Sequence, residues 1–349
     1  MPRTFRLFRC QSLRPLALFA LLLLVTACTK DGDNVDPNSV LRPIRVGVPF
    51  QPDVQFAPVY LAAAAGHFAD AGLEVALEYG SESDFVRLVA AGEMDAAIVS
   101  GEQVILARAN DIPVTYVMSW YQRFPVVVFG KSGAFEDAAD LRELNIGLPM
   151  LSGASYIGWQ ALLAANDLDE DQVDTEVVGF DQLNAVCDDR VDAAVGYAAN
   201  EPVRTCGDGE EMQVLEIADE FNVVSNGLIV NGDSIGNENA DKVYAGLVKA
   251  LILGIRDSLS KPDKAFEAAL DEIPEIDDDE VRGLQREVLE ASLRFWEVPK
   301  GEIMGLPDAD QWRDSVELLV EQGLIKVGDA PDVRDLIDDR YAAAADVTR

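Results

Sequence analysis

The chain is short of the residues that most enzyme centres need. It has one histidine, His67, and four cysteines in 349 residues, and these do not cluster. A zinc or iron site needs several such ligands at short spacing. A Ser-His-Asp centre would depend on His67, which follows an alanine run and Gly66 and is expected at the surface end of a helix. Glycine loops with the Walker or dinucleotide spacing are also missing. We therefore expect no metal, no cofactor and no enzymatic activity.

Basic residues are scarce as well. The 28 lysines and arginines face 62 aspartates and glutamates, which gives a net charge of −34. Such a surface repels nucleic acids and anionic lipid headgroups, so neither is an expected partner. The acidic excess fits a saline habitat and simple solubility equally well.

A single apolar run stands out, and it is too short to span a bilayer. Residues 15–25 follow four arginines, which is the order of charged and apolar regions in an export signal. Val-Thr-Ala then precedes Cys28, and this stretch resembles the lipobox of bacterial lipoproteins. The resemblance implies a signal peptide over residues 1–27 and acylation of Cys28, with palmitate among the acyl groups. It also implies anchoring on the extracytoplasmic face of the cell membrane. An ordinary secretory signal with an incidental cysteine is the alternative. Residues 28–43 are expected to form a flexible tether.

Two segments of the chain occur twice in the same order. Residues 45–50, Arg-Val-Gly-Val-Pro-Phe, are similar to residues 145–150, Asn-Ile-Gly-Leu-Pro-Met. Residues 93–100, Glu-Met-Asp-Ala-Ala-Ile-Val-Ser, are similar to residues 190–197, Arg-Val-Asp-Ala-Ala-Val-Gly-Tyr. The offsets of 100 and 97 residues are nearly equal. We therefore expect two lobes built on one plan.

Each half has the pattern strand, helix, strand, helix, strand. Short apolar runs predict the strands, and apolar spacing of i, i+3, i+4 before a glycine predicts the helices. Strands that alternate with helices are typical of parallel, doubly wound sheets. In the first half the strands are expected at residues 44–48, 73–77 and 96–99, with one helix ending near residue 66 and another at 84–91. In the second half the same order is expected at residues 146–148, 157–165, 176–178, 183–187 and 193–195.

One more strand, at residues 225–230, is followed only by helices. These are expected at residues 243–259, 265–270, 279–295, 309–322 and 332–341. With no third sheet to cover, they are expected to return to the first lobe. The first lobe would then comprise residues 44–129 and 227–349, and the second lobe residues 130–226, with crossings near 126–130 and 226–230. Two crossings make a hinge, and a hinge between two lobes makes a cleft.

The cleft residues follow from the strand ends. Open parallel sheets bind ligands beyond the carboxyl ends of their strands, where helix N-termini present backbone N–H groups. Segments 51–60, 100–103, 152–156 and 197–201 meet this rule, and 119–122 precedes the first crossing. Their aromatic residues suit the faces of a flat ring, and their amide and hydroxyl groups suit its edges. Half of these aromatic residues could instead belong to the core, and Trp159 is expected to do so. The nearby acidic residues disfavour a strongly anionic ligand. The candidate ligand-binding residues are Gln55, Phe56, Tyr60, Asp84, Ser100, Glu102, Gln103, Trp120, Tyr121, Ser155, Tyr156, Tyr197, Asn200, Glu201 and Asn226.

The first of these segments carries a family resemblance. Residues 55–62, Gln-Phe-Ala-Pro-Val-Tyr-Leu-Ala, together with residues 66–68 and 71–75, resemble the opening of ABC-importer substrate-binding proteins related to thiamine-pyrimidine synthase. Residues 191–197, followed by Asn-Glu-Pro at 200–202, resemble the second-lobe signature of that family. The resemblance implies an α/β, two-lobed periplasmic-binding-protein fold of type II, with two doubly wound sheets and two hinge crossings.

The resemblance also implies a ligand. Residues 54–58, 120–122 and 225–228 look closest to the riboflavin-binding lipoprotein branch. The pyrimidine-binding branch typically has a tryptophan and a histidine in the first segment, and the synthases have a cysteine-rich motif and a histidine that this chain lacks. A monomer that captures riboflavin for the membrane permease of an ABC importer is therefore expected. An aminopyrimidine precursor of thiamine, paired with Glu201, and a ligand sensor of the same fold are the alternatives.

Two cysteines flank the strand expected at residues 193–195. An exported protein works in an oxidising compartment, so a disulfide between Cys187 and Cys206 is one expectation. Two separately buried thiols are the other.

Overall fold

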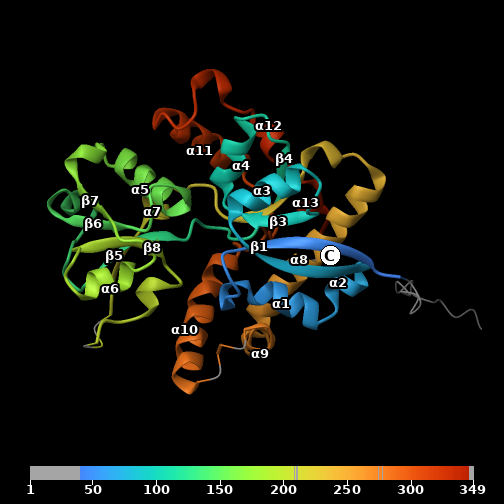
Figure 1. Ribbon diagram of the computed structural model, residues 1–349, viewed down its shortest axis with the longest axis horizontal. Helices are drawn as coiled ribbons and strands as arrows, with labels where there is room; N and C mark the ends of the chain where they lie inside the picture. Colours follow the sequence, from blue (N-terminus) through green and yellow to red (C-terminus); the bar gives the residue numbers. More distant parts are fainter. Residues whose placement is uncertain (1–39, 208, 210, 274, 277, 346–349) are drawn as a thin grey trace, which may run out of the picture. The chain divides into compact units, whose positions relative to one another are not determined.

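The computed structural model describes residues 40–345 except residues 208, 210, 274 and 277. The expected signal peptide, Cys28 and most of the expected tether lie outside the described residues. Ten strands in this part of the chain form two five-stranded sheets (Figure 1). The first sheet has the order β2-β1-β3-β10-β4, and the second has the order β7-β6-β8-β5-β9. The strands are β1 (Arg42–Pro49), β2 (Leu73–Gly80), β3 (Ala96–Val99), β4 (Val114–Ser119), β5 (Val126–Gly130), β6 (Asn145–Leu148), β7 (Asp174–Val177), β8 (Ala193–Tyr197), β9 (Gln213–Glu216) and β10 (Gly227–Asn231).

Each sheet contains one strand that runs against its neighbours. In the first sheet β1 is parallel to β2 and β3, whereas β10 is antiparallel to β3 and β4. In the second sheet β6 is parallel to β7 and β8, whereas β5 is antiparallel to β8 and β9. The sheets are therefore mixed rather than parallel throughout. The reversed strands β5 and β10 are those that enter a sheet directly after the chain has crossed from the other one.

The two sheets share one plan, as the repeated segments predicted. Asp95, just before β3, accepts a hydrogen bond from the backbone N–H of Arg45 in β1 (2.9 Å). Asp192, just before β8, accepts the same bond from Asn145 in β6 (2.8 Å). In both sheets the aspartate fixes the register between the first strand and the central one. The repeated motifs are thus one contact between strands, made twice.

Helices cover both faces of the first sheet (Figure 1). On one face α1 contacts α8 and α9, and α13 contacts α8 and β4. On the other face α3 contacts β3 and α4 contacts β4. The C-terminal helices α8 and α13 thus pack on the first sheet. The helices are α1 (Ala57–Ala64), α2 (His67–Asp70), α3 (Glu82–Ala90), α4 (Gly101–Arg108), α5 (Gly153–Ala165), α6 (Gln182–Cys187), α7 (Ile217–Glu220), α8 (Glu238–Ser260), α9 (Pro262–Glu272), α10 (Asp279–Trp296), α11 (Ala309–Glu321), α12 (Val333–Leu336) and α13 (Arg340–Ala345).

Several local expectations need correction. The chain enters β1 at Arg42, so the expected tether ends earlier than residue 43. Segments 100–103 and 152–156, expected beyond the ends of strands, form the N-caps and first turns of α4 and α5. The helix expected at 332–341 is two short helices, since Ile337 between them is extended and bridges to Tyr116 of β4.

His67 is half-buried rather than a free surface residue. It begins α2, and its Nε2 lies 2.9 Å from Oδ2 of Asp257 in α8. The imidazole therefore links α2 to α8, which is a structural role.

The chain crosses between the sheets at residues 120–125 and 221–226, just before the strands β5 and β10 that were expected to be the crossings. The backbone N–H of Trp120 donates to the carbonyl oxygen of Asn226 (2.9 Å), and that of Phe124 donates to Oδ1 of Asn222 (3.1 Å). The two crossings are thus hydrogen-bonded to each other. The exposed rings of Phe50 after β1 and Phe180 after β7 also bring the two sheets' loops together, with centroids 5.6 Å apart.

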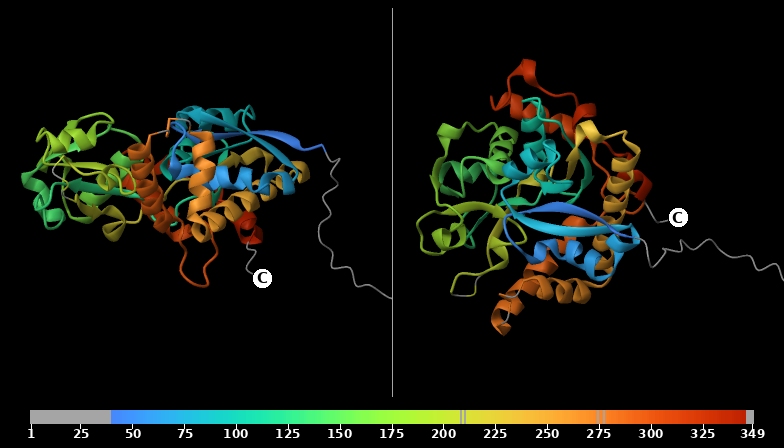
Figure 2. Two further views of the ribbon diagram at one scale, coloured as in Figure 1. Left: turned by 90° about the horizontal axis from the view of Figure 1, so that it is seen from below. Right: turned by 45° about the vertical axis from the view of Figure 1, so that its right-hand side comes forward.

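The end of α10 braces the first crossing. Its Phe295 carbonyl oxygen accepts a hydrogen bond from the N–H of Gln122 (2.7 Å). Its Arg294 pairs with Glu216 at the end of β9 (2.5 Å), and Arg123 in the crossing pairs with the same carboxylate (2.9 Å). Figure 2 shows α10 in orange beside the second sheet, in green. A helix that follows the first sheet in sequence therefore also holds the second sheet.

Cys187 and Cys206 form a disulfide with Cα atoms 5.4 Å apart. The bond joins the end of α6 to the segment after β8, and the two cysteines are separated by 19 residues. Closing a loop of this size stabilises a folded chain by about 3 kcal/mol.

No helix within residues 40–345 is both long and apolar enough to span a membrane. Nor do three or more His, Cys, Asp or Glu side chains gather as a metal would need in that part of the chain.

Two helical glycines allow the effect of close packing on stability to be distinguished from the effect of helix propensity. A Cβ at position 254 of α8 would lie 2.2 Å from the carbonyl oxygen of Pro58 in α1, whereas one at position 283 of α10 would meet nothing within 4 Å. We expect Gly254→Ala to lower the free energy of unfolding by about 1–3 kcal/mol, because backbone must move. The matched control Gly283→Ala should raise it by up to about 1 kcal/mol. Chemical unfolding of both variants checks this, and equal effects would contradict the close contact of α1 with α8.

Candidate ligand-binding site

One polar cluster lies where β2 and β3 end. Glu82 in the first turn of α3 accepts hydrogen bonds from the backbone N–H (3.1 Å) and Oγ (3.0 Å) of Ser100, the N-cap of α4. Asn226, just before β10, donates from Nδ2 to Ser100 Oγ (3.2 Å) and to Glu82 Oε1 (3.4 Å). Burial raises the pKa of Glu82, and the Ser100 bonds oppose that rise. Three elements of the first sheet thus hold one carboxylate among neutral donors.

Glu102, in the first turn of α4, is fully buried. Its Oε1 accepts a hydrogen bond from Nε2 of Gln103 (3.3 Å), and its Oε2 has no partner among the described residues. Burial and then the charge of Glu82 raise the pKa of Glu102 to about 8. Glu82 accepts three hydrogen bonds and Glu102 accepts this one, so the proton of the pair resides on Glu102 at neutral pH.

A second polar cluster follows β1. Asp53 caps the short helix η1 (Val54–Phe56), and its Oδ1 accepts hydrogen bonds from the backbone N–H (2.9 Å) and Nε2 (3.2 Å) of Gln55. The N–H of Asp53 donates to the hydroxyl of Tyr60 (3.3 Å), which also accepts from the hydroxyl of Tyr79 (3.2 Å). Burial raises the pKa of Asp53, while the Gln55 bonds and the charge of Arg204 lower it.

The second sheet supplies the residues that meet Asp53. Glu201, which begins the short helix η4 (Glu201–Val203), accepts hydrogen bonds from the N–H of Tyr197 (2.8 Å) and Nδ2 of Asn200 (3.4 Å). Arg204 donates to Oδ1 of Asn200 (3.4 Å), and its buried Nε has no partner among the described residues. Burial raises the pKa of Glu201, Arg204 lowers it, and Asp53 raises it further. Charged groups from both sheets therefore act on one another here.

Two tyrosines connect the clusters. Burial and then the charges of Glu82 and Glu102 raise the pKa of Tyr197, the last residue of β8, well above its ordinary value. Tyr121, in the first crossing, also acts on Tyr197, and burial and the charge of Asp53 raise its own pKa. A residue at the end of the second sheet thus lies within electrostatic reach of the carboxyl groups that follow β2 and β3 of the first sheet.

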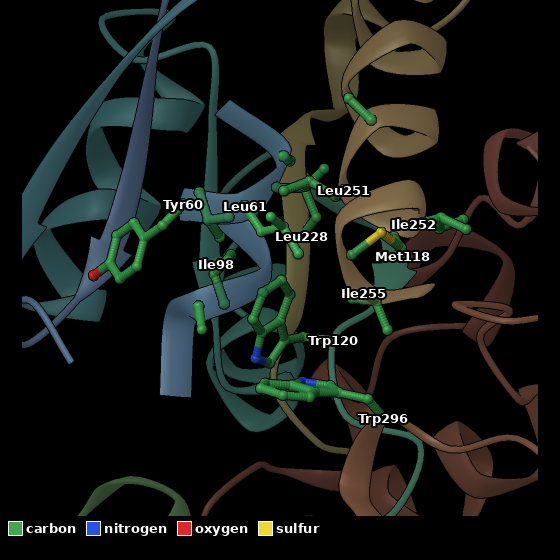
Figure 3. Close-up of a cluster of buried hydrophobic side chains, with 14 of the residues drawn as sticks. Tyr60, Leu61, Ile98, Met118, Trp120, Leu228, Leu251, Ile252, Ile255 and Trp296 are labelled. Atoms are coloured by element: carbon green, nitrogen blue, oxygen red, sulfur yellow. The ribbon is translucent and has the colours of Figure 1, made fainter. Parts of the chain in front are cut away.

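Trp120 belongs to the hydrophobic core of the first sheet. It is fully buried, and its ring packs edge-on against Trp296 of α10 at 5.9 Å. Figure 3 shows the two rings together, with Ile98 and Leu228 of the first sheet beside them. Phe56, whose ring centroid is 6.3 Å from that of Trp120, is partly exposed. Trp120 therefore packs beside Phe56, and Phe56 is the ring of this pair that is partly exposed.

Three expected residues lie apart from these two clusters. Asp84 is exposed and pairs with Arg87 one turn along α3. Ser155 is buried in the first turn of α5, and the neighbouring Tyr156 donates from its hydroxyl to Oε1 of Glu170 (3.3 Å). Although α5 contacts α4, no described hydrogen bond or ion pair joins these three residues to Glu82, Glu102 or Asp53.

The structure adds residues that the sequence reasoning missed. Glu82, Asp53 and Arg204 belong to the site, and each follows the carboxyl end of a strand. The same rule that selected the other segments would have found Glu82 if it had been applied to the end of β2.

Glutamine at position 102 should change how stability depends on pH. The folded chain binds the Glu102 proton more tightly than the unfolded chain does, so this group destabilises the protein as pH rises from about 4.5 through about 8. At neutral pH the free energy of unfolding of Glu102→Gln should therefore exceed that of the wild type by on the order of 2 kcal/mol. In acid the two free energies should be equal. Urea unfolding across this pH range measures the difference. The exposed Asp84→Asn is the control, and parallel curves for Glu102→Gln and the wild type would refute a buried titrating Glu102.

Comparison with known proteins places these features in a family. Residues 53–265 match the NMT1/THI5-like family. The chain is 36% identical over 322 residues to the riboflavin-binding protein RibY of Chloroflexus aurantiacus, covering 87% of this chain and 91% of that one. It is 26% identical over 313 residues to the formylaminopyrimidine-binding protein of Halalkalibacterium halodurans, covering 88% and 93%.

A solved structure shows the same fold. The periplasmic aliphatic sulphonate binding protein SsuA of Escherichia coli superposes with a TM-score of 0.68 at 13% identity, over 85% of this chain and 92% of that one. The two mixed sheets and their crossings are thus the α/β, two-lobed arrangement of a periplasmic binding protein, as the sequence predicted. The chain belongs to the NMT1/THI5-like family.

Proposed function

We propose that this protein binds riboflavin between its two sheets, as the extracytoplasmic substrate-binding lipoprotein of an ABC importer. The observation that carries the proposal is that α4, which bears Glu102, contacts α5 on the second sheet, and that Tyr197 at the end of β8 lies within electrostatic reach of Glu82, Glu102 and the crossing residue Tyr121. The similarity of 36% to a riboflavin-binding protein over nearly the whole chain supports this choice of ligand.

Riboflavin matches the chemistry of the converging groups. It combines a flat, uncharged tricyclic ring with an imide edge and a chain of hydroxyls. The partly exposed rings of Phe56 and Tyr197 suit its faces, and carboxyl and amide groups such as Asp53, Glu201 and Gln103 suit its edges and hydroxyls. Buried carboxyl groups repel a phosphate, so the phosphorylated flavin should bind more weakly than riboflavin.

An aminopyrimidine precursor of thiamine is the second candidate. The half-buried carboxyl group of Glu201 could accept a hydrogen bond from an exocyclic amine, and one relative of 26% identity is a formylaminopyrimidine-binding protein. A single ring would cover less of the aromatic surface than a tricyclic one. Absence of flavin quenching at micromolar protein, together with tight binding of an aminopyrimidine, would replace riboflavin by this ligand.

Delivery to a membrane permease follows from the proposed anchor at Cys28. Lipid on this residue would keep the protein at the extracytoplasmic face of the membrane, within reach of a permease. A sensor of the same fold would instead be encoded beside a kinase. Purified protein that leaves the ligand chemically unchanged supports binding over catalysis.

Removing the ring of Tyr197 should weaken riboflavin binding. We expect Tyr197→Ala to cost roughly 1–3 kcal/mol of binding free energy, because the ligand loses apolar contact area. Tyr197→Phe retains the ring and should lose less. Quenching of flavin fluorescence gives the dissociation constants, and far-UV circular dichroism verifies folding. Wild-type affinity in the alanine variant would show that Tyr197 does not contact the ligand.

Replacing Cys28 tests the anchor. We expect Cys28→Ser to move the protein from the membrane fraction to the soluble extracytoplasmic fraction, because serine cannot carry the thioether-linked lipid. Immunoblotting of the fractions measures the partition, with Cys187→Ser as a cysteine variant that should stay in the membrane fraction. Continued membrane partition of a processed Cys28→Ser protein would end the lipoprotein proposal.

A further inference from the structure

One oxygen atom in the candidate site lacks a partner. Oε2 of Glu102 is buried and makes no hydrogen bond with the described residues, whereas Oε1 accepts from Gln103. A buried polar atom without a partner costs free energy, so it is kept where something else supplies the bond. Gly101 in the same turn packs against Val224 of the second crossing, and α4 contacts α5, which covers the second sheet, so this turn lies where the two sheets meet.

The charge of this carboxyl group follows from its neighbours. Glu82 on α3 already accepts three hydrogen bonds and is the better site for a negative charge. Two carboxylates this close in a buried place do not both ionise. Glu102 therefore holds the proton in neutral solution. Three other elements pack on α4, and the polar group of each has its own partner. Tyr116 of β4 is bonded to the carbonyls of Ser225 and Asn226, and Tyr156 of α5 is bonded to Glu170. The backbone oxygen of Asp335 in α12 is bonded to Arg108 at the far end of α4.

We propose that Glu102 determines specificity by donating a hydrogen bond from its protonated carboxyl group to a carbonyl oxygen of the ligand. This inference rests on the proposed function. Riboflavin presents two carbonyl oxygens on its imide edge and satisfies such a donor. An exocyclic amine at that place would leave donor facing donor, so the arrangement selects a dione edge over an aminopyrimidine edge.

The proposal makes ligand capture depend on pH. Ionised Glu102 cannot donate, and it adds a second negative charge beside Glu82. Binding should therefore weaken by about tenfold between about pH 7 and about pH 9. Glu102→Gln retains an N–H donor that does not titrate in this range, so its affinity should stay nearly constant. Removal of the Glu82 charge lowers the pKa of Glu102. Glu82→Gln should therefore shift the loss of affinity to lower pH.

The test is fluorescence titration of riboflavin with wild type, Glu102→Gln, Glu82→Gln and the exposed control Asp84→Asn at several pH values in this range. Deprotonation of the flavin imide itself is common to all four proteins and cancels in the comparison. A loss of affinity in the wild type and Asp84→Asn that Glu102→Gln lacks supports the role of Glu102. Equal pH profiles for wild type and Glu102→Gln overturn that role and leave riboflavin binding standing. Absence of riboflavin binding by the wild type at every pH overturns the proposed function and this inference together.

Should Glu102→Gln fail to fold, the comparison of the wild type with Glu82→Gln decides. A midpoint that moves to lower pH in Glu82→Gln supports the coupled carboxyl pair as the origin of the pH dependence. An unchanged midpoint overturns it.

Discussion

The placement of Asn226 is the constraint on which both the crossings and the site depend. Its carbonyl oxygen accepts hydrogen bonds from the N–H of Trp120 (2.9 Å) and the hydroxyl of Tyr116 (3.0 Å), which fixes one crossing against the other. Its side chain donates to Ser100 and Glu82 in the first polar cluster. Gly227 must follow, because a Cβ there would lie 2.0 Å from the ring of Tyr116. A shift of one crossing against the other therefore acts directly on the carboxylate of Glu82.

Features that depend on local sequence were predictable. The paired motifs around Asp95 and Asp192 predicted that the two sheets share one plan. Each aspartate accepts a hydrogen bond from the backbone of the equivalent strand in its own sheet, β1 or β6. Helix α3 ends before Gly92, whose φ of +69° suits a residue without a side chain, and apolar periodicity located most other elements within a few residues. The direction of β5 and β10 was not predictable in this way, because it depends on which sheet the strand enters.

The site was harder to predict because its members are set by distant contacts and by small errors in element ends. Strand β2 runs to Gly80 instead of residue 77, so α3 begins at Glu82 and not at Asp84. Two residues along a helix turn a side chain to nearly the opposite face, which puts Asp84 in solvent and Glu82 in the cluster. Trp120 is buried because Trp296, far along the chain, packs against it. The residues around position 120 do not predict that Trp296 is the partner.

A chain with a net charge of −34 gains nothing from further ionised carboxylates in its interior, and the structure shows how it accommodates them. Glu82 accepts from the N–H of Ser100, Asp53 from that of Gln55, and Glu201 from that of Tyr197. Backbone N–H groups can stabilise a carboxylate without adding a full positive charge, whereas a set of lysines would also attract phosphate. At Glu102 the side chain of Gln103 and the residue's own backbone N–H lower the pKa, but burial and the charge of Glu82 outweigh them, so this group stays neutral. The arrangement therefore favours an uncharged ligand with many hydrogen-bonding groups, since such a ligand can satisfy the remaining polar atoms without bringing a charge that the site would have to balance.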